Sequence, residues 1–132
     1  LIVDLATLTG SCVNTFGTWV NGMAANDSFY ARQIFESGQR TFERVWELPL
    51  YPEYKDDIKS DIADLKNLGN SKFAGMLTAS AFLNAFVGET PWVHVDIAGP
   101  AFLPSPSAYL AKGGTGVGVR LLVDLARTMA WK

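Results

Sequence analysis

The sequence has few of the features that would link it to nucleic acid, to a membrane or to a disulfide framework. Its 11 basic and 13 acidic residues give a net charge of −2, which offers no basic surface for nucleic acid or anionic lipid. No stretch reaches the roughly 18 consecutive apolar residues of a membrane-spanning helix. The single cysteine, Cys12, cannot form a disulfide within the chain. We therefore expect neither nucleic acid nor a membrane as a partner, and a buried thiol in a reducing, cytoplasmic setting.

The beginning of the chain also lacks the usual signals. There is no initial Met, no leader and no basic region before the apolar run that starts at Leu1. Because a domain rarely opens on a bare core strand, we expect the chain to be a piece of a longer protein. Its 132 residues amount to one domain, and its 48% hydrophobic and 18% charged residues are typical of a globular fold.

Histidine is almost absent, which limits the catalytic arrangements that the chain could form. His94 is the only one. A Ser-His-Asp site would need it, but the sequence has no G-x-S-x-G motif, and nothing in the sequence links it to Cys12 as a nucleophile. His94 lies between Val93 and Val95 on an expected strand. We therefore predict a buried, hydrogen-bonded core histidine rather than a metal ligand.

What the sequence does contain is a strong strand-and-turn signal in residues 1–10, LIVDLATLTG. An apolar run leads into a small, polar turn, and Thr9 can cap a short helix over residues 11–16. Ligands of open α/β folds bind outside the carboxyl ends of such strands, and Gly10 would let a ligand approach the backbone. These ten residues alone also fit an ordinary buried strand followed by a capped helix.

Further elements follow in alternation, which predicts an α/β fold with a mixed β-sheet flanked by helices, an α/β/α sandwich. Residues 101–114, which contain two prolines and two glycines, are expected to form a loop. We expect the helix over residues 74–87 to be buried on all sides, and Thr115 to cap the last helix. Strands or extended segments are expected over residues 19–25, 45–50, 61–67 and 92–97, and the other helices over 29–42 and 51–60.

Two further sequence patterns give little support for a phosphate-binding or catalytic site. Residues 113–116, GGTG, resemble a phosphate-binding loop only loosely, because they lack both a GK[ST] ending and a G-x-G-x-x-G match. The carboxylates between Glu53 and Asp64 are interleaved with lysines, which is typical of a solvated face. From the residues alone, the chain therefore shows strand ends suited to binding and no complete catalytic set.

Five segments occur in the order and spacing of one family: LIVDLATLTG, ERVWELPL, SDIADLKN, WVHVDIAG and TGVGVRLL. Together they make the chain resemble the C-terminal part of the catalytic domain of the leucyl aminopeptidases, the M17 family of two-metal peptidases. The resemblance runs over essentially the whole chain, so residues 1–132 are expected to be a partial catalytic domain. It departs from the common pattern at Pro100, where many relatives have a small or hydroxylated residue.

The resemblance implies a hydrolase that releases N-terminal, leucine-like residues from peptides with two divalent metal ions, Zn or Mn. It also implies a homo-oligomer, a hexamer in the family. The family's metal ligands are a lysine and carboxylates, two of which come from an NTDAEGR segment that this sequence lacks. None of the acids here matches a metal ligand, and the catalytic lysine and arginine are absent too. We therefore expect this chain alone to bind no catalytic metal and to be inactive.

The resemblance leaves the wall of the substrate cleft to this chain. Thr7, Leu8 and Gly10 match positions whose backbone groups align the peptide. His94 and Asp96 match structural positions. Ala98 matches the floor of the pocket for the first side chain of the substrate, and Ala101 matches the rim of that pocket. Leu68 matches an apolar contact for the second residue of the substrate. An alternative remains open, in which the chain is a non-catalytic α/β module for peptide binding or assembly.

Overall fold

Four strands form the central sheet of the computed structural model, which describes residues 1–130. They are β1 (Ile2–Ala6), β2 (Asn21–Ala25), β3 (Val45–Glu47) and β4 (Trp92–Asp96), and their spatial order is β1-β4-β2-β3. β1 runs parallel to β4 and β2 parallel to β3, whereas β2 and β4 are antiparallel. The sheet is therefore mixed, which confirms the prediction.

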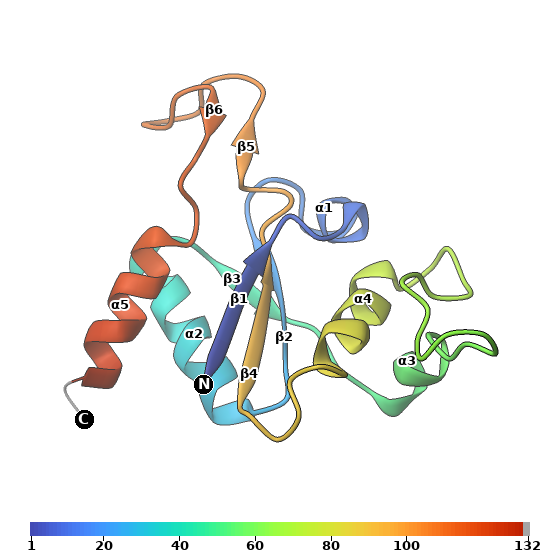
Figure 1. The fold of residues 1–132 in the computed structure, drawn as a ribbon. Helices are drawn as coiled ribbons and strands as arrows, with labels where there is room; N and C mark the ends of the chain where they lie inside the picture. The colour runs from blue at the N-terminus through green and yellow to red at the C-terminus, as the bar shows by residue number, and fades with distance from the viewer. Residues whose placement is uncertain (131–132) are drawn as a thin grey trace.

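Helices cover both faces of this sheet (Figure 1). On one side lie α2 (Ser28–Thr41) and α5 (Val119–Ala130), which also pack against each other. On the other lie α1 (Gly10–Phe16) and α4 (Gly75–Asn84), with the short α3 (Pro52–Asp56) packed against α4. The predicted α/β/α arrangement is confirmed. None of the helices within residues 1–130 is long and apolar enough to cross a membrane.

The main core lies between the sheet and the α2–α5 layer. Alternate residues of a strand point to opposite faces, so Val93 and Val95 point into this core while His94 points away from it. Burying each such aliphatic side chain contributes about 1.5–3 kcal/mol. The other fully buried members are Met23, Ala31, Ile34, Val45, Leu121 and Leu125.

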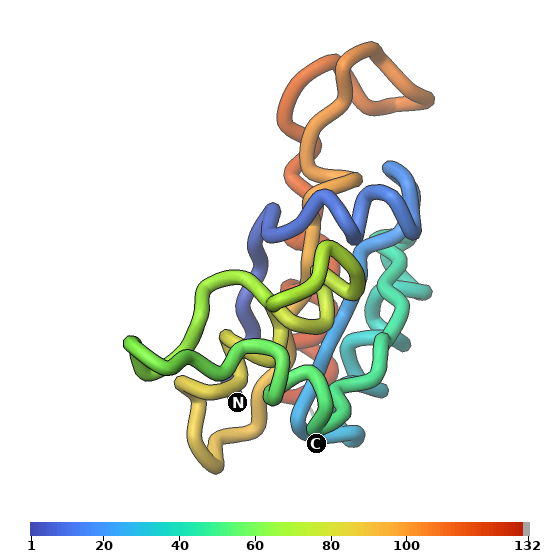
Figure 2. Tube along the Cα trace, turned by 90° about the vertical axis from the view of Figure 1, so that its right-hand side faces the viewer, coloured from blue at the N-terminus to red at the C-terminus, as the bar shows by residue number. Residues whose placement is uncertain are grey.

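Residues 101–114 form an arm that extends beyond the end of the sheet (Figures 1 and 2), not the plain loop that we predicted. Within it, β5 (Phe102–Leu103) and β6 (Gly113–Gly114) pair antiparallel. The base of the arm is closed by Thr115, whose N–H donates to the Ala101 carbonyl and whose hydroxyl donates to the Pro100 carbonyl. The pairing of β5 with β6 is supported by these hydrogen bonds of Thr115. They join residues 14 or 15 positions apart, so no local sequence pattern predicts them.

Thr115 does not cap the last helix, so that prediction is wrong. α5 begins at Val119, after Gly116 and Gly118, which both have positive φ. Its first turn is capped instead by Glu43, whose carboxylate accepts hydrogen bonds from the N–H groups of Gly118 and Leu121 at 3.0 and 2.8 Å. A carboxylate from a distant part of the chain thus satisfies donors that Thr115 cannot reach.

The strand predicted over residues 61–67 is also wrong, because the structure has only bends there. The Ser60 hydroxyl accepts from the N–H groups of Ile62 and Ala63, which folds the chain into a local turn. Ile62 is 98% exposed, so the alternating apolar residues find no sheet to pack against. The helix expected over residues 74–87 ends at Asn84, and it is buried on one face and half-buried on the others rather than buried on all sides.

His94 is buried and hydrogen-bonded, as predicted. It is fully shielded from solvent, and its Nδ1 lies 2.6 Å from Asp4 Oδ1. The other oxygen of Asp4 accepts a hydrogen bond from the Trp92 indole at 2.6 Å, and the two rings of β4 stack. Asp4 therefore holds two large side chains of the neighbouring strand in place.

We predict that His94→Ala in the full-length protein lowers stability and leaves the metal content unchanged. Removing the ring leaves a half-buried carboxylate oxygen without its partner, and such a loss costs about 1–3 kcal/mol. Thermal unfolding and elemental analysis of the same preparation test this. Loss of metal from a variant that melts at the wild-type temperature would show that His94 is a ligand.

Candidate functional site

The carboxyl ends of β1 and β4 lie at the same edge of the sheet, because the two strands are parallel and Ala6 is paired with Asp96. The Asp96 side chain is fully buried there and binds both turns that follow. Its Oδ1 accepts from the N–H groups of Leu8 and Ala98, each at 3.1 Å, and its Oδ2 accepts from the Thr9 hydroxyl at 2.6 Å. One carboxylate thus fixes the position of the two turns relative to each other.

The Thr9 hydroxyl also starts α1, as predicted. While it donates to Asp96, it accepts a hydrogen bond from the Cys12 N–H at 3.0 Å, which is the expected geometry of an N-cap. Cys12 is buried behind this turn, and burial, with the nearby Asp96 carboxylate, raises the pKa of its thiol to about 11. The thiol is therefore protonated at neutral pH, which argues against a nucleophile at this position.

The raised pKa of Cys12 predicts a pH dependence of stability. Below the unfolded pKa of 9.0 the thiol is protonated in both states, and its contribution is fully present. Between pH 9 and about 11 only the unfolded chain ionises, so that contribution is lost as the pH rises. Melting temperatures measured across this range should fall more steeply for the wild type than for Cys12→Ala. Parallel curves for the two proteins would contradict the shift.

Five of the six residues predicted to line the cleft lie at this edge of the sheet. Thr7, Leu8 and Gly10 are exposed, and Ala98 and Ala101 are half-buried. The Ala101 N–H donates to the Ile97 carbonyl, which keeps it beside the turn after β4. A Cβ placed on Gly10 would have no other atom within 4 Å, so there is open space above its backbone. This edge of the sheet therefore has exposed backbone, two alanine side chains and open space at Gly10.

Leu68 is the exception. It lies in the segment between α3 and α4 and is 82% exposed. Among residues 1–130, no hydrogen bond or ring contact joins it to either turn. After that segment, the Met76 N–H donates to the Ser11 hydroxyl at 2.8 Å, which ties the start of α4 to α1.

The described residues of this chain do not fit a metal centre. Within residues 1–130, no group of three or more His, Cys, Asp or Glu side chains is arranged to hold a metal ion. Asp96, the carboxylate that binds both turns, already accepts three hydrogen bonds from the chain itself. In the part of the chain that the structure describes, the edge thus offers exposed backbone beside small side chains, and its buried carboxylate is used to hold the two turns.

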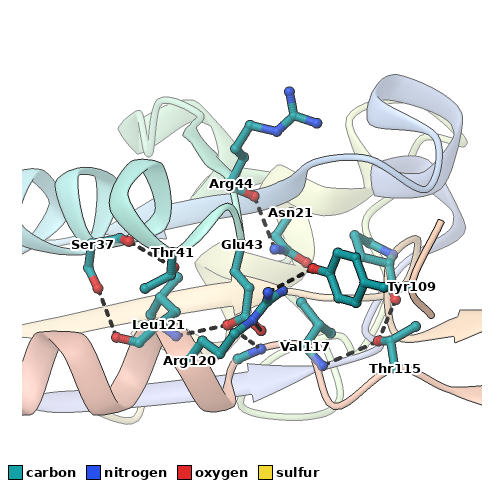
Figure 3. A network of polar contacts seen from close by, with 12 residues as sticks. Asn21, Ser37, Thr41, Glu43, Arg44, Tyr109, Thr115, Val117, Arg120 and Leu121 are labelled. Carbon is teal, nitrogen blue, oxygen red and sulfur yellow. Dashed lines mark hydrogen bonds and ion pairs between the residues drawn. The ribbon is translucent and has the colours of Figure 1, made fainter.

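Sequence reasoning missed a second polar cluster, which lies where the arm meets the rest of the fold (Figure 3). Its centre is Glu43, which is 5% exposed and accepts from the Arg120 Nε at 3.1 Å in addition to the N–H groups of Gly118 and Leu121. Arg120 also donates from Nη1 to the Tyr109 hydroxyl at 2.7 Å. Tyr109 and Glu43 together raise the pKa of the guanidinium above its ordinary value. Glu43 and Arg120 are 77 positions apart, so no local pattern in the sequence pairs them.

Comparisons with known proteins agree on one family. The sequence model of the M17 peptidases, described as "Cytosol aminopeptidase family, catalytic domain", matches residues 1–123. A "Probable cytosol aminopeptidase" of Alkaliphilus oremlandii (strain OhILAs) is 51% identical over 128 residues, which are 97% of this chain and 26% of that protein. A protein of the same description from Geobacter sulfurreducens is 50% identical over 123 residues, 93% of this chain and 25% of its own length. The chain therefore spans about a quarter of the length of these curated relatives.

Proposed function

This chain belongs to the M17 cytosol aminopeptidase family, and from that membership we propose that it is part of the catalytic domain of an enzyme that releases N-terminal, leucine-like residues from peptides. The observation that carries the proposal is the edge of the sheet at which Asp96 fixes two turns around open space. Carboxyl ends of strands are the common position for ligands in α/β folds.

In this proposal the chain binds and orients the substrate. The exposed backbone of Thr7, Leu8 and Gly10 aligns the peptide, and the space above Gly10 lets the substrate main chain come close. Ala98 forms the floor of the pocket for the first side chain and Ala101 its rim, because their methyl groups leave volume for a leucine-like group. Leu68 makes an apolar contact to the second residue.

Two divalent metal ions, Zn or Mn, would polarise the scissile carbonyl and activate a water in the complete enzyme. Since the described residues of this chain do not fit a metal centre, their ligands would come from the rest of the protein. The relatives are about four times as long as this chain, which leaves ample sequence for them.

The sheet itself supports a larger catalytic domain. β1 stands at one edge of the spatial order, and Leu1 and Ile2, at its start, are 42% and 41% exposed. An apolar edge strand with unpaired backbone groups favours pairing with further chain. We propose that the remainder of the protein covers this edge.

The full-length protein tests the function directly. We expect it to hydrolyse leucine amide and to leave N-acetyl-leucine amide intact, because the reaction requires a free N-terminus. A chelator should abolish the activity, and Zn or Mn should restore it. Hydrolysis of both substrates at equal rates, or activity that a chelator does not change, would contradict the proposal.

The alternative of a non-catalytic module for peptide binding or assembly has one observation in its favour. The arm carries exposed aromatic side chains, Phe102 at 60% and Tyr109 at 69%, which could contact other subunits. We include a homo-oligomer, a hexamer as in the family, and a cytoplasmic location in the main proposal. The same assay separates the two functions, because a module would bind leucine peptides without hydrolysing them.

A further inference from the structure

A cavity of about 380 Å³ lies between the arm and the turn that joins α2 to β3. This volume is within the range of roughly 300–1,000 Å³ that small-molecule sites occupy. None of the six residues assigned to the substrate cleft lines it. The cavity is therefore separate from the cleft, and the proposed function does not use it.

One residue that lines the cavity, Asn21, has a buried acceptor without a partner among the described residues. Asn21 is 2% exposed, and its Nδ2 donates to the Arg44 carbonyl at 3.0 Å. Its Oδ1 has no hydrogen-bond partner among the described residues. In Figure 3 the amide nitrogen of Asn21 faces Arg44, and its oxygen is directed to the side on which Tyr109 lies. Because buried acceptors are nearly always satisfied, this oxygen points to a donor that residues 1–130 do not supply.

The cavity also presents a cation. The Arg120 side chain is 47% exposed, and its hydrogen bonds to Glu43 and Tyr109 use only two of the five N–H groups of a guanidinium. The Glu43 side chain is 3% exposed and its oxygens are covered by three donors, so the guanidinium is the charge that faces outward. A second guanidinium, of Arg44, stacks over the Phe42 ring beside the same cavity. A carboxylate is the group that such a site favours.

The remaining walls are apolar. Trp19, Phe42 and Tyr109 line the cavity with exposed rings, together with the prolines at positions 104 and 106. The acceptor would bind an ammonium group, the guanidinium a carboxylate, and the aromatic wall an apolar side chain. An apolar α-amino acid has all three groups. We propose that this cavity is a second binding site for a free apolar α-amino acid, such as leucine. The choice of leucine rests on the proposed function, since it would be the reaction's product.

The test is equilibrium dialysis of the full-length protein with radiolabelled L-leucine. We expect two leucines per chain in the wild type, and one in Ala98→Leu, which fills the cleft but leaves the cavity. Asn21→Leu should also bind one, with the cavity's affinity at least tenfold weaker. This variant keeps the fold, because the Asn21 N–H still donates to the Arg44 carbonyl at 2.9 Å. Arg120→Gln is a second variant with the same expected loss, and Arg127→Gln, on the exposed side of α5, is the matched control.

Isoamylamine, which lacks the carboxylate and has no amide bond to hydrolyse, and N-acetyl-leucine, which lacks the ammonium, should both fail to compete at the cavity. One leucine per wild-type chain that Ala98→Leu abolishes would overturn the inference and leave the proposed function intact. Two leucines per chain without hydrolysis of leucine amide would support the cavity site and contradict the proposed function. Binding that neither Asn21→Leu nor Arg120→Gln weakens would place the second site elsewhere and overturn the assignment.

Discussion

Replacing Asp96 with alanine should remove most of the activity of the full-length protein and lower its stability by roughly 2–4 kcal/mol. Three donors lose their acceptor at once: the N–H groups of Leu8 and Ala98 and the hydroxyl of Thr9. Both turns of the proposed cleft wall are then free to move. A displacement of about 1 Å near reacting groups costs on the order of 100-fold in rate. Thermal unfolding and kcat/KM for leucine amide measure the two effects.

Two milder variants separate positioning from general destabilisation. Asp96→Asn keeps one oxygen for the two N–H groups, so it should retain more activity than Asp96→Ala. Thr9→Val removes only the hydroxyl and with it the cap of α1, so it should cost about 1 kcal/mol and leave Leu8 and Ala98 in place. An Asp96→Ala protein that melts at a lower temperature but keeps wild-type kcat/KM while folded would show that the turns are not part of the cleft.

Ala98→Leu should discriminate between substrates. The added side chain would fill the pocket proposed for the first residue, so we expect KM to rise far more for leucine amide than for alanine or glycine amide. Overpacking a close-fitting site costs roughly 1–3 kcal/mol, which is about 5- to 150-fold in kcat/KM. Steady-state kinetics on the three amides with the full-length protein give the ratio.

Ala126→Leu is the matched control, because it adds the same atoms at an exposed position of α5, on the other side of the sheet. It should leave the substrate ratio unchanged. Equal losses on all three amides in Ala98→Leu would make Ala98 a structural residue and remove it from the pocket.

Much of the fold was predictable because the relevant signals are local. Thr9 caps α1 through a hydrogen bond three residues along the chain, and Asp27 caps α2 in the same way. The alternation in β4 puts Val93 and Val95 in the core and His94 on the opposite face. Such contacts need only the neighbouring residues, so the sequence pattern is enough.

The errors come from contacts between distant residues. Glu43 caps α5 although it lies 75 positions before Gly118, from whose N–H it accepts a hydrogen bond. We had expected Thr115, which is close in the sequence, to be the cap. Residues 61–67 alternate like a strand, but no neighbouring strand is available, and the Ser60 hydroxyl turns the chain instead. Periodicity shows that a segment can form a strand. It does not show which partner the strand would pair with.

The candidate site was predicted from resemblance rather than from spacing. The turns after β1 and β4 are almost 90 residues apart, and the hydrogen bond from Leu8 to Asp96 spans 88 positions. Only the parallel pairing of β1 with β4 brings them together. Asp96 was expected to be structural, and in the structure its carboxylate holds the turns after β1 and β4. The cavity beneath the arm has no sequence motif, because its parts come from four separate segments of the chain.

A crystal structure of the full-length protein with a non-hydrolysable leucine peptide analogue tests the central claim most directly. The account predicts the first side chain of the analogue against Ala98 and Ala101, and its main chain along the turn of Thr7, Leu8 and Gly10. A leucine side chain bound away from these turns, with the edge of β1 and β4 empty, would contradict the assignment of this chain as the wall of the substrate cleft.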